Sequence, residues 1–334
     1  MDEVLSNVIK KNKSVFDMFK GYKEDEKVKI TYIMGNHDRL INSEGYDDIR
    51  EKIREASGIT YVKNKGEPFP WEYRVDGLPI YAVHGNNYDV YNKTEDNALP
   101  VGDAIVTLLI NQYPEEVKKV IDDPKVHHDL QEIDNLRPST ITPYWIDQVK
   151  SSLKPKKNQD ILIDTWKRLS DQFFNNAFVK DWMQKHDYLS LLPDDADKLE
   201  IAFKHFTDTT LERIYEKFLE IKRDFIKDTD KNALEALKLC EKYQCDYVLF
   251  GHTHESYVQL LDVENGTERY YINTGTWRRR IVPGGYKKKQ IVFGQQESID
   301  YVLFKIDEQS NEVKGFQLWN GTSNRGELFY SKEE

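Results

Sequence analysis

Apolar and polar positions follow two different periodicities along the chain. Residues 1–23 and 47–56 carry apolar side chains at helical spacing, so we expect a helix in each segment. Short runs of branched and aromatic residues predict strands at four places, residues 28–34, 59–62, 72–75 and 78–83. The first 93 residues therefore alternate strands and helices, which is typical of an α/β domain.

The pattern changes at about residue 94. From there to about residue 243 the chain is rich in charged residues, and its aromatic side chains recur at helical spacing and predict the core of a helical cap. Strand patterns return at residues 246–250, 269–281 and 298–306. We therefore expect an α/β body formed by residues 1–93 and 244–334, with mixed sheets, interrupted by a helical insertion over residues 94–243.

Composition limits the class of protein. The 334 residues are 39% hydrophobic and 32% charged, and no apolar run reaches the roughly 20 residues that span a bilayer. The charged N-terminus lacks the apolar core of a signal peptide, so we expect a cytoplasmic protein without a membrane contact. The net charge of −10 disfavours, without excluding, a nucleic-acid partner. We expect Cys240 and Cys245 to be reduced, half-buried thiols, with a disulfide between them as the alternative.

Metal-binding side chains occur where three predicted strands meet a glycine, in "YIMGNHD", "YAVHGNN" and "VLFGHTH". Since ligands of open α/β folds bind at the carboxyl ends of strands, these side chains are expected to converge. Imidazole suits zinc, iron and manganese, and amide and carboxylate oxygens suit harder ions. A single buried histidine is more often a core residue, but three such motifs together favour a metal site. The candidates are Asn36, His37, Asp38, His84, His252 and His254.

The motifs "GNHD", "HG" and "GHTH" resemble, in this order, three of the five motifs of the calcineurin-like metallophosphoesterases. The resemblance covers residues 28–90 and 246–306. It implies a layered α/β fold and two divalent ions, Mn²⁺, Zn²⁺ or Fe, that activate water to hydrolyse a phosphomonoester or phosphodiester.

The same resemblance implies the role of each residue. Asn36, His84 and His252 would ligate one ion and His254 the other. His37 would protonate the leaving oxygen or hold the phosphoryl group, and Asp38 would orient the His37 imidazole.

Two motifs of that family are absent from this sequence. No histidine has an aspartate two positions before it, and the one Gly-Asp pair, Gly102-Asp103, follows the third motif. The 27 residues before the first predicted strand are too few to hold two further strands and a helix. We therefore expect the N-terminal strands to be missing, with one of three causes: a longer functional chain, a partner chain that completes the sheet, or a binding or scaffold subunit that has lost the site. This chain alone would then hold one ion or none.

The segment "TWRRRIVPGGYKKK" places basic and aromatic residues together. Arg278, Arg279 and Arg280 directly follow a predicted strand and are candidates to bind the phosphate of an ester substrate, with a solvated loop as the alternative. Lys287 to Lys289 are expected to face solvent. Asn87 follows His84 closely and is a further candidate for substrate binding, with a turn that closes onto the insertion as the alternative.

Overall fold

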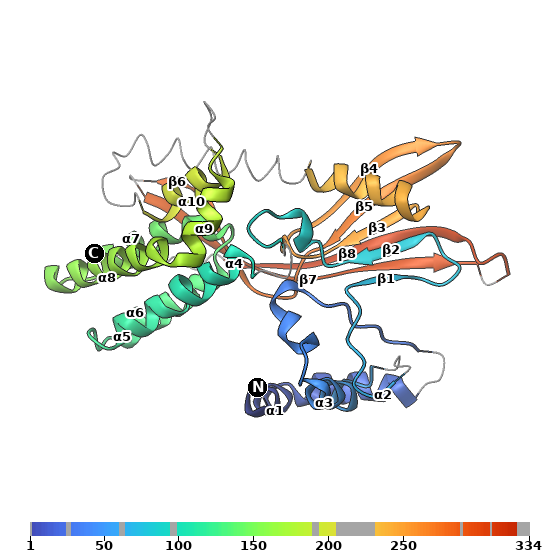
Figure 1. Ribbon diagram of the computed structural model, residues 1–334, viewed down its shortest axis with the longest axis horizontal. Helices are drawn as coiled ribbons and strands as arrows, with labels where there is room; N and C mark the ends of the chain where they lie inside the picture. The colour runs from blue at the N-terminus through green and yellow to red at the C-terminus, as the bar shows by residue number, and fades with distance from the viewer. Residues whose placement is uncertain are drawn as a thin grey trace. The chain divides into compact units, whose positions relative to one another are not determined.

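The computed structural model describes residues 2–24, 28–59, 64–93, 99–188, 194–204, 231–287, 290–307 and 309–325 (Figure 1). Contacts divide the chain into two compact units, each built from three segments. Unit 1 comprises Met1–Asn86, Ala233–Gly275 and Val302–Leu318, and unit 2 comprises Asn87–Asn232, Thr276–Tyr301 and Trp319–Glu334. Helices and two sheets make the protein a mixed α/β structure, which is the expected class at this level of detail.

Unit 1 contains a five-stranded mixed sheet in the order β1-β2-β3-β5-β4. Strands β2, β3 and β5 run parallel, whereas β1 and β4 pair antiparallel at the two edges. Asn265 and Gly266 join β4 to β5 with positive φ angles of 50° and 83°, as a two-residue hairpin turn requires. The strands are β1 (Glu72–Arg74), β2 (Ile80–Val83), β3 (Tyr247–Phe250), β4 (Ser256–Glu264) and β5 (Thr267–Thr274).

Three helices form the N-terminal part of unit 1, α1 (Asp2–Lys11), α2 (Lys13–Glu24) and α3 (Asp47–Ser57). The predicted helix over residues 47–56 is confirmed by α3, which ends at Gly58 in the left-handed conformation. The single helix predicted for residues 1–23 is wrong, because the chain breaks at Asn12. The Asn12 side chain donates to the Val8 carbonyl (2.9 Å), and such local bonding by asparagine competes with helix continuation.

Two of the four predicted early strands are confirmed, as β1 and β2. The strand predicted for residues 28–34 is wrong: Met34 N donates to Pro70 O (2.9 Å), but the segment belongs to neither sheet in the described part of the chain. Strand-forming residues need a neighbouring ladder as well as local propensity. Most of the strand predicted for residues 59–62 lies outside the described residues.

The strand predicted for residues 269–281 is two strands. Strand β5 ends at Thr274, Gly275 turns the backbone at a φ of 65°, and β6 (Arg280–Lys287) begins after it. Strands β6, β7 (Gln290–Ile306) and β8 (Val313–Arg325) form a second sheet in that order. The solvated loop that was the alternative for residues 276–289 is therefore a strand from Arg280 to Lys287, and the side chains of Lys287 to Lys289, whose exposure was expected, lie outside the described part of the chain.

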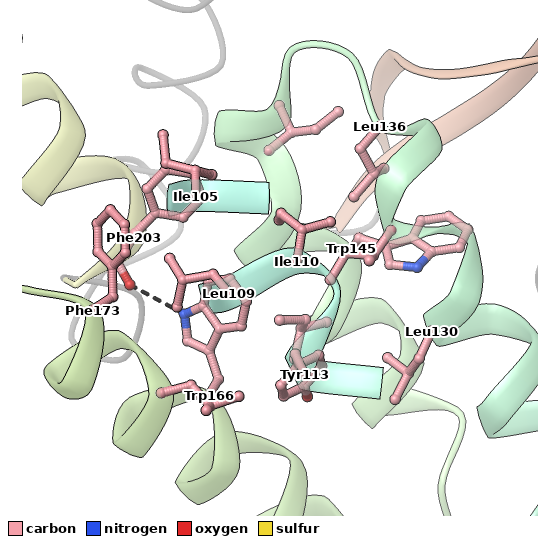
Figure 2. Close-up of a cluster of buried hydrophobic side chains, with 14 of the residues drawn as sticks. Ile105, Leu109, Ile110, Tyr113, Leu130, Leu136, Trp145, Trp166, Phe173 and Phe203 are labelled. Carbon is pink, nitrogen blue, oxygen red and sulfur yellow. Dashed lines mark hydrogen bonds between the residues drawn. The ribbon is translucent and has the colours of Figure 1, made fainter. Parts of the chain in front are cut away.

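Unit 2 is mostly helical and has its own apolar core. Figure 2 shows part of this core, where the Trp166 Nε1–H donates to the Phe203 carbonyl (3.1 Å). Trp145, Trp166, Tyr113 and Phe173 are almost completely buried, so the prediction that the aromatic residues form the core of a helical region is confirmed. The helices are η2 (Asn86–Tyr88), α4 (Val101–Ala104), η3 (Ile105–Ile110), α5 (Gln112–Lys118), α6 (Pro124–Gln131), η4 (Glu132–Asn135), η5 (Ser139–Ile141), α7 (Thr142–Ser151), α8 (Lys156–Asn175), α9 (Ala177–His186) and α10 (Asp195–Phe203).

The contacts divide the chain differently from the expected domain boundaries. Residues 244–334 were all expected in the α/β body, but residues 276–301 and the described part of the segment after residue 318 group with the helices of unit 2. Ile281 of β6 and Phe293 of β7 lie in the helical core, and the Phe293 ring packs edge-on against Trp145. Apolar burial against the helices therefore decides where these strands belong.

Residues 231–243 form a further helix, which leads into β3. In the described part of the chain, no helix combines the length and the apolar character needed to cross a bilayer.

Candidate metal centre

Strands β2 and β3 bring two of the candidate histidines together. The strands are parallel neighbours, with Ile80 opposite Tyr247 and Ala82 opposite Leu249. His84 follows β2 directly and His252 follows β3, so both lie at the same edge of the sheet. Their ring centroids are 5.2 Å apart, with the rings near perpendicular.

Asn36 meets His84 from a third segment. It begins the short helix η1 (Asn36–Asn42), is 1% exposed, and places Oδ1 at 3.0 Å from His84 Nε2. Gly35 makes this approach possible. A Cβ atom at Gly35 would lie 3.2 Å from both Cε1 and Nε2 of His84, so a larger residue would push the ring away. The glycine of "GNHD" therefore provides space, because its φ of −95° suits any residue.

The environment of His84 keeps its imidazole neutral. Burial, followed by the nearby His252 and His37, lowers the pKa of His84 from its ordinary value to about 4. A neutral imidazole has a lone pair to offer, as metal binding requires.

The "GHTH" turn holds its histidines in an unusual backbone conformation. His252 and His254 have φ angles of 64° and 65°, which non-glycine residues rarely adopt. Thr253 N donates to Gly251 O (2.7 Å) around His252, the pattern of a strained γ-turn. Gly251 N in turn donates to His84 O (3.0 Å). Strain of this kind persists only where surrounding bonds enforce it, and it is concentrated at functional sites.

Asn273 enforces the turn and was not among the predicted site residues. It is 1% exposed in β5, and its Nδ2 donates to Gly251 O (2.8 Å) and lies 3.0 Å from the Tyr271 hydroxyl oxygen. Its Oδ1 accepts from Gly275 N (2.9 Å). An asparagine inside the apolar run "YYINTG" is the sequence signal that could have identified it.

His37 and Asp38 occupy the next two positions of η1. His37 is exposed, yet close enough to His84 to act on its pKa. The Asp38 carboxylate accepts from Gly35 N (3.2 Å) and from the Tyr32 hydroxyl, and burial together with this carboxylate raises the pKa of Tyr32. Asp38 therefore shapes the glycine turn. Its expected bond to the His37 imidazole stays a prediction.

The pair formed by Asn36 and His84 fits one divalent ion. Two ligand atoms about 2.0–2.2 Å from one ion, at tetrahedral or octahedral angles, are separated by roughly 3.0–3.5 Å. The 3.0 Å between Oδ1 and Nε2 falls at the start of this range, and the space above Gly35 is where a Cβ would intrude. Among the described residues, however, no three His, Cys, Asp or Glu side chains form a cluster that could hold a metal. Within the described residues, Asn36 and His84 thus fit two ligand positions of one ion.

The three candidate arginines form contacts within unit 2. Arg278 pairs with Asp134 and its Nε donates to Asn135 Oδ1 (2.9 Å), and Arg279 pairs with the buried Glu132. Arg280 Nη2 donates to the Gln296 side chain (3.1 Å).

The contacts of Arg278 and Arg279 connect the segment before β6 to η4, and the contact of Arg280 joins β6 to β7. The arginines therefore have a structural role that the sequence did not suggest. Asn87, in η2, is exposed. The expected substrate contacts of these four residues stay predictions.

No protein-family model matches the chain, and no curated protein matches it either.

Proposed function

We propose that the protein is a metal-dependent hydrolase of phosphoric esters, with its metal centre at the edge of the unit 1 sheet. The observation that carries the proposal is the 3.0 Å separation of Asn36 Oδ1 and His84 Nε2 above Gly35, with His252 beside them. The likeness of "GNHD", "HG" and "GHTH" to metallophosphoesterase motifs gives the same assignment from the sequence alone.

In this proposal Asn36, His84 and His252 hold one divalent ion, and His254 is available to a second. Mn²⁺, Zn²⁺ and Fe suit these amide and imidazole donors. The bound ion supplies Lewis-acid polarisation of a phosphoryl oxygen. A complete family site would hold two ions.

Side chains of this protein would donate the proton and hold the turns that carry the reacting groups. The exposed His37 donates a proton to the oxygen of the leaving group as its bond to phosphorus breaks and water attacks from the opposite side. Asp38 and Tyr32 fix the turn that carries His37. Asn273 holds the Gly251 carbonyl, which keeps His252 turned toward His84. Arg278 to Arg280 and Asn87 remain the candidates for binding the rest of the ester.

A second function, that of a binding or scaffold subunit, is favoured by one observation. The described residues contain no cluster of three or more His, Cys, Asp or Glu that could hold a metal, so the carboxylate ligands of a two-ion centre are not found there. A further segment or a partner chain that supplied them would restore the hydrolase.

Hydrolysis of p-nitrophenyl phosphate and bis(p-nitrophenyl) phosphate with added Mn²⁺ tests the proposal. We expect turnover that is abolished in His84→Ala and Asn36→Ala but unchanged in His128→Ala, a histidine with an exposed side chain. Turnover that survives both site substitutions would refute the hydrolase assignment. Absence of turnover with either ester in a folded, metal-loaded protein would favour the scaffold.

A further inference from the structure

The two cysteines occupy a helix-capping motif in unit 1. The helix over residues 231–243 ends where Gln244 adopts a φ of 52°, and Cys245 N then donates to Cys240 O (3.1 Å). A left-handed residue at the end of a helix, together with a hydrogen bond from the N–H of the sixth residue back to the carbonyl of the first, defines a Schellman motif. Cys240 therefore lies three residues before the last helical residue, Tyr243, and Cys245 is the second residue beyond it.

This motif brings those two side chains into contact. In most proteins the two positions carry a pair of apolar residues that touch. Here both are thiols, 1% and 5% exposed, and neither forms a disulfide. The two thiol groups share a hydrogen bond. The expected reduced state is thus observed, although the thiols are buried rather than half-buried.

We infer that Cys240 and Cys245 form a redox-active pair, which a peroxide closes into a disulfide across the helix cap. The 3.1 Å hydrogen bond from Cys245 N to Cys240 O holds the two Cα atoms near each other, and disulfides join Cα atoms that are roughly 4.4–6.8 Å apart. This inference does not depend on the metal centre.

The chemistry of the pair defines the order of events. One thiol must first lose its proton. The hydrogen bond with Cys240 lowers the pKa of Cys245, so we take Cys245 as the nucleophile, whose thiol donates to the Leu239 carbonyl oxygen (3.8 Å) while it is protonated. Its thiolate attacks one oxygen of hydrogen peroxide, the O–O bond breaks, and a sulfenic acid and a water form. The Cys240 sulfur then attacks the Cys245 sulfur, the S–O bond breaks, and a second water leaves. Two thiols and one peroxide give one disulfide and two waters.

The disulfide would join the helix end to the start of β3. This strand begins at Tyr247 and leads into the Gly251–His254 turn, so oxidation would stiffen the segment that carries His252. The neutral oxidant must reach a buried sulfur, so the reaction is expected to be slow.

The chain offers a direct readout because trypsin cleaves between the two cysteines, after Lys242. The native protein is incubated with hydrogen peroxide, alkylated under denaturing conditions and digested without reductant. We expect peptides 239–242 and 243–269 to be recovered as one species, lighter by two hydrogens than their sum and separated by reductant. Recovery of both peptides alkylated, or of Cys245 as a sulfinic or sulfonic acid without a crosslink, would overturn the inference.

A thermal unfolding measurement tests independently whether a disulfide between Cys240 and Cys245 fits the native helix cap. The oxidised protein should unfold at a higher temperature than the reduced protein, because the crosslink fits the native cap. In Cys240→Ala, peroxide should produce neither the crosslink nor the increase. A disulfide that lowered the unfolding temperature would contradict the claim that the cap arranges the two thiols for bonding.

Discussion

His84 Nε2 lies 3.0 Å from Asn36 Oδ1, although the two residues are 48 positions apart in the chain. Three separate local structures produce this contact: the end of β2, the start of η1, and Gly35, whose missing side chain leaves room for the imidazole. In this structure the contact is a hydrogen bond, in which Asn36 Oδ1 can only accept and His84 Nε2–H therefore donates. An ion that displaced this proton would find both lone pairs at the spacing of two ligands of one ion, and this is the structural basis of the proposed metal centre.

Replacing Gly35 by alanine tests whether metal binding by His84 needs the space that the missing side chain of Gly35 leaves. The new Cβ would lie 3.2 Å from His84 Cε1 and Nε2, so the ring must move by a few tenths of an ångström. We expect Gly35→Ala to fold and to bind Mn²⁺ about 10-fold more weakly or worse, as measured by calorimetric titration.

Gly21→Ala is the matched control for this change. Gly21 lies in α2, and no atom lies within 4 Å of the position of a Cβ there. This variant should keep its metal affinity and gain up to about 1 kcal/mol of stability from helix propensity. Equal metal affinities in the two variants would contradict the role assigned to Gly35.

Asn273 should stabilise both the fold and the turn that carries His252. Asn273→Ala removes the acceptor of Gly275 N in a buried site, which costs roughly 1–3 kcal/mol. It also removes one of the two donors to Gly251 O, which keeps its bond from Thr253 N. Urea unfolding should show this loss, and the metal affinity should fall with it. The exposed Asn175, which bonds to Asp171 O within α8, is the control, and Asn175→Ala should cost less than about 0.5 kcal/mol. An Asn273→Ala variant as stable as this control would rule out the supporting role.

Substitutions of Arg278 and Arg279 can distinguish a structural contribution of these side chains from a contribution to substrate binding. Arg279→Ala would leave the buried Glu132 without its guanidinium partner, and we expect a loss of about 1–3 kcal/mol in urea unfolding. Arg278 and Asp134 are 46% and 37% exposed at their side chains, so Arg278→Ala should cost only about 0–1 kcal/mol. If Arg278 also binds the ester, its loss raises KM while stability stays close to that of the native protein. Equal stability losses in the two variants would contradict this division of roles.

The sequence was most informative about features that depend only on residues close together in the chain. The helix predicted for residues 47–56 is present as α3. The Asn265–Gly266 turn and the left-handed Gly58 at the end of α3 are local signals of the same kind, although neither was among the predicted features. The aromatic residues of unit 2 are buried as their helical spacing predicted. The meeting of His84 and His252 could be expected because the parallel strands β2 and β3 present their carboxyl ends at one edge, whereas Asn36 joins them from a segment outside the sheet.

Features that depend on tertiary context could not be predicted in this way. Residues 28–34 have strand-forming side chains, but strand formation depends on a neighbour that local sequence does not reveal. The role of Asn273 depends on the carbonyl of Gly251, 22 residues away. The pairing of Arg279 with Glu132 joins residues 147 positions apart, and no local pattern marks it.

Metal content per chain tests the central claim most directly. The protein is purified with Mn²⁺ present, and the bound metal is measured by elemental mass spectrometry in the native chain, in His84→Ala and in His128→Ala. The account predicts about one tightly held ion per native chain, the same amount in His128→Ala and none in His84→Ala. A native chain that holds no ion, or a His84→Ala variant that keeps its ion, would contradict the account.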